Sequence, residues 1–141
     1  MHFFGHRVVY EDITIELHEA IRKAIEEYGV TTFWCGGYGA FDEKAAGAVF
    51  RIKQRYSEIE LLLIRAYLPK QRDQLPEIYD GSIYPEGLEN VPKRFAISHR
   101  NQWMATNCDM VIAYIKHGYG GAFKAYSIAR NKGKVLFTIG E

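Results

Sequence analysis

Two glycine-rich turns with a tyrosine inside them stand out in the sequence: GGYG at residues 36–39 and GYGG at residues 118–121. Each follows an apolar run and precedes a helical pattern, so each is predicted to join the carboxyl end of a strand to the N-terminus of a helix. Such a terminus offers unpaired N–H groups and partial positive charge, and glycine lets a phosphate approach the backbone closely. Tight turns also favour glycine for its tolerance of positive φ alone. The pair of turns favours a phosphorylated ligand.

Several polar side chains accompany these turns. Asp42, in the first turn of the helix after the first glycine turn, could accept hydrogen bonds from ribose hydroxyls or only stabilise the helix terminus. Arg100 and Met104 share a helix face, and the guanidinium could hold a phosphate at two points or pair with a surface carboxylate. His6 and His117 each follow a predicted strand, where they could reach a phosphate, carry a proton or remain solvated.

Tyr38 and Tyr119 lie inside the glycine turns, where each ring could cover a base or close the wall of a pocket. The sequence contains no Ser/His/Asp arrangement, no G-x-x-x-x-G-K-[ST] motif, no G-x-G-x-x-G in the first turn and no metal-ligand spacing. Hydride transfer and ATP hydrolysis are therefore disfavoured. We expect no metal site and no required cofactor, only a nucleotide or nucleotide-derived ligand.

Apolar runs alternate with helical patterns along the chain. Strands are predicted at residues 2–4, 30–35, 59–68, 109–115 and 134–139, and helices at 13–28, 41–56, 98–108 and 120–132. Asp12 or Thr14 is expected to cap the first helix, Gly29 to end it, and Ser98 to cap the third. This alternation predicts an α/β fold: a Rossmann-like, doubly wound, mostly parallel five-stranded sheet with helices on both faces.

All four prolines fall in the segment between residues 69 and 95, which has little periodicity. Irregular connections of this length are uncommon in compact domains unless they serve as lids or binding loops. The segment leaves the carboxyl end of the third predicted strand, at the edge that carries both glycine turns. We therefore expect it to cover a bound ligand.

Length and composition limit the remaining possibilities. The 141 residues suit a single domain over residues 1–141, and no window is apolar enough for a membrane span, so no membrane partner is expected. A net charge of +1 makes nucleic acid an unlikely partner. The N-terminus lacks an apolar signal region, and Cys35 and Cys108 lack CxxC spacing, which together predict a cytoplasmic protein with reduced thiols.

The stretches FFGHR, GGYGAFDEKAA and RNQWMATNCDMVIAYIKHGYGGAFKAYSIARNKGKVLFTI together resemble the YpsA-like branch of the SLOG superfamily. This superfamily of Rossmann-like nucleotide-binding proteins is named after the Smf/DprA DNA-processing proteins and the LOG hydrolases. The resemblance spans nearly the whole chain. It implies a ligand site made of Gly5, His6, Arg7, Gly36, Gly37, Gly39, Asp42, Arg100, Gly118, Gly120 and Gly121. Tyr38, His117 and Tyr119 join this predicted site by their position in the turns.

The chain departs from the LOG hydrolases at one element. Those enzymes combine an arginine in an R-x-x-x-M helix with a glutamate shortly after a P-G-G-x-G-T turn. Arg100 and Met104 match the helix, but HGYGGAFKAY lacks the proline and threonine and has Phe123 and Lys124 where acidic residues are expected. The usual catalytic glutamate is therefore missing from its place.

Three functions remain open at this level. The first is a cytoplasmic binding module or sensor for a nucleotide or nucleotide-derived phosphorylated ligand. The second is an N-glycoside hydrolase of nucleoside 5′-monophosphates, in which Arg100 takes part and Asp42 or Glu43 replaces the missing glutamate. The third, single-stranded DNA binding, is disfavoured by the near-neutral charge. A homodimer is also possible, since SLOG relatives often pair and Trp103 could supply an apolar contact.

Overall fold

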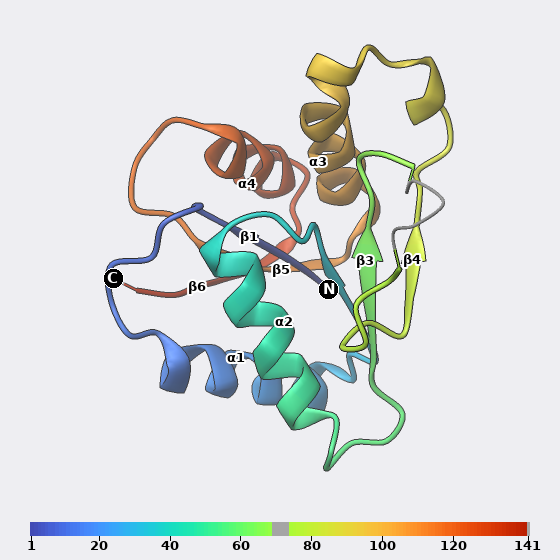
Figure 1. Ribbon diagram of the computed structural model, residues 1–141. Coiled ribbons are helices and arrows are strands. Elements are labelled where there is room, and N and C mark those ends of the chain that lie inside the picture. Colours follow the sequence, from blue (N-terminus) through green and yellow to red (C-terminus); the bar gives the residue numbers. More distant parts are fainter. Residues whose placement is uncertain (69–73, 141) are drawn as a thin grey trace.

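The computed structural model describes residues 1–68 and 74–140, which form one sheet with helices on both sides (Figure 1). The strands are β1 (His2–Gly5), β2 (Thr32–Cys35), β3 (Glu60–Ile64), β4 (Gly81–Ile83), β5 (Met110–Tyr114) and β6 (Val135–Thr138). The α-helices are α1 (Thr14–Tyr28), α2 (Ala40–Ile52), α3 (Ala96–Asn107) and α4 (Gly121–Asn131). Two short 3-10 helices, η1 (Leu88–Asn90) and η2 (Lys93–Phe95), precede α3.

The sheet has the strand order β4-β3-β2-β1-β5-β6, and all neighbouring strands are parallel. The chain builds outward from β1 to β4 on one side and then returns to place β5 and β6 on the other side. Strand order therefore reverses between β1 and β5, whose carboxyl ends meet where Gly5 pairs with Tyr114. In parallel α/β sheets this reversal point is where ligands usually bind.

The two faces of the sheet carry separate apolar cores, as the doubly wound prediction requires. Successive side chains of a strand point to opposite faces, so Phe3 packs with residues of α1 and α2 while Phe4 packs with residues of α3 and α4. Figure 1 shows the same division, with α1 and α2 on one side of the sheet and α3 and α4 on the other. The predicted Rossmann-like α/β class is confirmed.

The predicted number of strands was wrong, because the sheet has six strands rather than five. The additional strand, β4, lies inside the segment expected to be irregular, of which residues 69–73 lie outside the described residues. It has only three residues and forms an edge, where it pairs with Leu62, Leu63 and Ile64 of β3. A half-buried edge strand as short as Gly-Ser-Ile carries no apolar run that would reveal it in the sequence.

The ends of α1 agree with the predicted capping residues, whereas the start of α3 does not. The Asp12 side chain accepts a hydrogen bond from the Thr14 N–H at 3.0 Å, and Gly29 ends α1 with φ of 68°. Ser98 does not cap α3, because that helix already begins at Ala96. Within the part of the chain that the structure describes, no helix is long and apolar enough to cross a bilayer.

Candidate ligand-binding cleft

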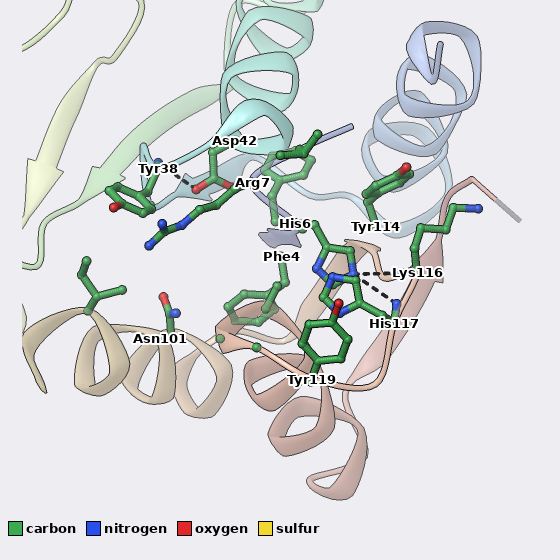
Figure 2. A pocket seen from close by; sticks show the side chains of 18 of the residues that line it. Phe4, His6, Arg7, Tyr38, Asp42, Asn101, Tyr114, Lys116, His117 and Tyr119 are labelled. Atoms are coloured by element: carbon green, nitrogen blue, oxygen red, sulfur yellow. Dashed lines mark hydrogen bonds between the residues drawn. The ribbon is translucent and has the colours of Figure 1, made fainter. Parts of the chain in front are cut away.

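A cleft of about 590 Å³ opens at the carboxyl ends of β1, β2 and β5, next to the reversal of strand order. Most of the predicted site residues line it: Gly5, His6, Arg7, Gly36, Tyr38, Asp42, Arg100, His117, Tyr119, Gly120 and Gly121. Figure 2 shows Tyr38 and Asp42 on one side of this space and His117 and Tyr119 on the other. The fold thus brings both glycine turns to one cavity.

Four predicted residues do not line the cleft: Gly37, Gly39, Glu43 and Gly118. Gly37 has φ of +70°, and a Cβ there would lie 2.7 Å from Leu63 Cδ1. Gly39 has φ of +94°, and a Cβ there would lie 2.8 Å from Arg7 Cα. These two glycines are therefore required by backbone conformation and close packing. Glu43 is exposed on α2, and Gly118 is exposed beyond β5.

Sequence reasoning missed other lining residues, among them His2, Phe4, Asn101, Tyr114 and Lys116. Asn101 directly follows Arg100, and Lys116 directly precedes His117. Each could have been predicted as a polar residue next to a predicted site residue. The remaining three lie inside predicted strands, where nothing in the sequence distinguishes a residue lining a cleft from one buried in the core.

Arg100 is buried, with 5% of its surface exposed. Its Nη1 donates hydrogen bonds to two carbonyl oxygens, that of Gly36 at 2.8 Å and that of Ile64 at 3.3 Å. Gly36 directly follows β2, and Ile64 is the last residue of β3. Burial lowers the pKa of Arg100, and the nearby Asp42 opposes this shift. A Cβ on residue 36 would lie 3.0 Å from the guanidinium carbon. Arg100 therefore holds two strand ends together, and residue 36 must be small beside it.

Asp42 is the acidic side chain that the described residues contribute to the cleft wall. It is 8% exposed, and its Oδ2 accepts a hydrogen bond from the Tyr38 N–H at 3.1 Å. Burial raises the pKa of Asp42 from 3.8 to about 6, although the Tyr38 hydrogen bond and the charge of Arg100 act in the opposite direction. A carboxyl group that faces a cavity and changes protonation near neutral pH can accept hydrogen bonds or transfer a proton.

The first glycine turn, at residues 36–39, is already occupied by groups of the chain itself. The Tyr38 N–H donates to Asp42, and the Ala40 N–H donates to the carbonyl oxygen of Arg7 at 2.8 Å. The Arg7 guanidinium carbon lies 4.4 Å from the centre of the Tyr38 ring, a cation–π arrangement. A ligand anion would therefore compete with a carboxylate at this turn.

The second glycine turn, at residues 118–121, is open by comparison. Gly120 caps α4 with φ of 92°, and α4 has neither a side-chain cap nor an acidic residue in its first turn. Gly121 and Ala122, the first two residues of α4, line the cleft. Because the first N–H groups of a helix have no partner within the helix, this terminus is available to an anion.

His6 positions the loop that leads to the second turn. Its Nε2 accepts hydrogen bonds from the N–H groups of Lys116 at 2.8 Å and His117 at 3.4 Å. Burial, and secondarily the charge of His117, lower the pKa of His6, which favours the neutral ring that can accept these bonds. The Lys116 ammonium pairs with Glu11 at 3.1 Å. This hydrogen-bond geometry makes His6 a support of the cleft wall.

These features define a class of protein: a Rossmann-like α/β domain whose parallel sheet carries a cleft at its reversal point. The fold is similar to that of the X-ray structure of DNA processing protein A (DprA) from Streptococcus pneumoniae, with a TM-score of 0.66 and 18% identity. The match covers 97% of this chain and 48% of that protein, so the chain spans about half its length. At this identity the likeness shows the fold alone.

No protein-family model and no curated protein matches the chain. The likeness to this structure therefore supports the predicted fold, whereas membership of the SLOG superfamily and of its YpsA-like branch stays a prediction. Within residues 1–68 and 74–140, no three His, Cys, Asp or Glu side chains are grouped so that they could hold a metal ion.

Proposed function

We propose that this chain is a binding module for a nucleotide or nucleotide-derived phosphorylated ligand, with the phosphate at the N-terminus of α4. The observation that carries this proposal is the uncapped helix terminus, at Gly120 and Gly121, that opens into the cleft. Free N–H groups and the helix dipole both favour an anion at this position. A cleft of about 590 Å³ falls within the usual range for small-molecule sites.

The opposite wall suits the sugar of such a ligand. Asp42 faces the cleft from the first turn of α2 and already accepts one hydrogen bond, from Tyr38. A carboxylate offers several lone-pair positions, so Asp42 retains acceptor capacity for ribose hydroxyls. This arrangement orients the ligand from phosphate at α4 to sugar near α2.

Calorimetric titration with the four common nucleoside 5′-monophosphates tests the proposal. Ala122, the second residue of α4, offers a matched pair of variants. Ala122→Asp would place a carboxylate where the phosphate is expected, whereas Ala122→Asn has nearly the same shape without the charge. We expect binding to the parent, at least tenfold weaker binding to Ala122→Asp, and a smaller effect of Ala122→Asn. Absence of binding by the parent at millimolar ligand, or equal effects of the two variants, would contradict the proposal.

A second candidate is an N-glycoside hydrolase acting on the same nucleotides, favoured by the pKa of about 6 of Asp42. Such a carboxyl group could activate water or stabilise positive charge on the sugar. Glu43, the other candidate, is exposed and does not line the cleft. Release of free base by the parent and its loss in Asp42→Asn would support this function. Because the name of the structural neighbour refers to DNA processing, a short single-stranded DNA should be titrated alongside the four nucleoside 5′-monophosphates.

A further inference from the structure

Three aromatic rings stack on the wall of the cleft that leads to α4. The centres of the His6 and His117 rings are 3.7 Å apart with 14° between their planes, and those of His117 and Tyr119 are 3.8 Å apart with 21° between their planes. All three residues line the cleft, and Figure 2 shows the rings lying against one another. Tyr119 forms the outer end of this stack and is 70% exposed.

The stack is held from its buried end. His6 is 9% exposed and is fixed by the two backbone hydrogen bonds that it accepts from the following loop. The buried Nδ1 of His117 has no hydrogen-bond partner in the described part of the chain, so stacking on both faces positions this ring. Tyr119 is therefore stacked on a ring that is itself held in place, so a ligand that binds to Tyr119 meets a partly preorganised surface.

The two tyrosines of the glycine turns each have one covered ring face, but Tyr119 is more exposed, at 70% against 45% for Tyr38. The Arg7 guanidinium lies over the ring of Tyr38. One face of Tyr119 is covered by His117, and its 70% exposure leaves the other face open. Tyr119 also directly precedes Gly120, the cap of α4. An open aromatic face and an open anion site are thus adjacent along the chain.

We propose that the open face of Tyr119 stacks on the nucleobase and makes the site selective for ligands that carry a base. This inference rests on the proposed nucleotide-binding function and narrows its ligand class. Every nucleobase has a flat π face, and stacking on an aromatic side chain strengthens binding of any base. A sugar phosphate without a base would occupy only the phosphate and sugar positions.

Calorimetric titrations of adenosine 5′-monophosphate and ribose 5-phosphate test this inference. The variants are Tyr119→Ala, Tyr119→Phe and, as a control, Tyr28→Ala, whose partly exposed ring at the end of α1 lies outside the cleft. We expect the parent to prefer the nucleotide by about tenfold, the magnitude typical of one base stacked on one aromatic ring. Tyr119→Ala should lose this preference without weakening ribose 5-phosphate, while Tyr119→Phe and Tyr28→Ala should retain it.

The outcomes separate the two proposals. Equal affinity of the parent for both ligands, or a preference that survives in folded Tyr119→Ala, overturns the role of Tyr119 and leaves phosphate binding intact. Failure of the parent to bind either ligand overturns the proposed function, and the stacking inference with it. Because Tyr119 is largely exposed, we expect Tyr119→Ala to fold, and circular dichroism verifies this before titration.

Discussion

Replacing Asp42 by Asn should stabilise the protein at neutral pH. Burial raises the pKa of this carboxyl group from 3.8 to about 6. The folded state therefore binds the proton more tightly than the unfolded state, so the stability that Asp42 contributes is fully present below pH 3.8 and is lost as pH rises through 6. A shift of about two units, at roughly 1.4 kcal/mol per unit, makes this loss about 3 kcal/mol at pH 7. Asn has no charge to desolvate and can still accept the hydrogen bond from Tyr38.

Urea unfolding of the parent and Asp42→Asn between pH 4 and 7.5 measures this effect. The variant should match the parent near pH 4 and exceed its free energy of unfolding by roughly 1 to 3 kcal/mol above pH 6.5. Glu43→Gln is the matched control, because this exposed carboxylate lies next to Asp42 on the same helix, and it should show little difference at any pH. A difference for Asp42→Asn that is independent of pH, or that has the opposite sign, would refute the reasoning.

The other predictions concern the supports of the cleft. Gly39→Ala should lower the free energy of unfolding by about 2 to 4 kcal/mol, because residue 39 has positive φ and a Cβ there would meet Arg7 in the loop after β1. Gly133 also has positive φ but faces open space, so Gly133→Ala should lower the free energy of unfolding, measured in urea, by only about 1 kcal/mol. Arg100→Lys should weaken nucleotide binding and lower stability by about 1 to 3 kcal/mol, because lysine has no counterpart of the Nε–H that donates to Asn101 and its shorter side chain does not reach the position of Nη1. Unchanged calorimetric affinity of the variant would contradict this prediction. Neutral His6 accepts hydrogen bonds from the amides of residues 116–117. Their protection from hydrogen exchange should therefore be present above pH 6.5 and lost as pH falls through the lowered pKa of His6. Protection that persists after the His6 ring has become protonated would contradict this role.

The fold class followed from the alternation of apolar runs and helical patterns, because strands buried on both faces and amphipathic helices differ strongly in sequence. The edge strand β4 escaped this reasoning, since three half-buried or exposed residues carry no periodicity. The start of α3 was placed too late for a related reason. Ser98 is a good capping residue, but the chain enters this helix from η2 at Ala96 without a side-chain cap.

The sequence predicted most of the residues that line the candidate site, but not what each of these residues does there. Sequence reasoning treated the two Gly-Tyr-Gly turns as equivalent, yet Asp42 and Arg7 occupy the first turn and leave the second open. These contacts depend on how the loop after β1 crosses the start of α2, which spacing along the chain does not encode. His6 was likewise singled out for its position, and its partners lie 110 residues away along the chain. Trp103, expected to offer a contact between copies, stacks on Trp34 with ring centres 5.1 Å apart.

The central claim, that a nucleotide phosphate binds at the N-terminus of α4, is tested most directly by following assigned backbone amide resonances during titration with a nucleoside 5′-monophosphate. The claim predicts the largest saturable shifts at Gly121 and Ala122, whose N–H groups would donate to the phosphate. It predicts smaller shifts at Tyr38, whose N–H already donates to Asp42. Shifts centred on the first turn, or no saturable shift at α4, would contradict the claim.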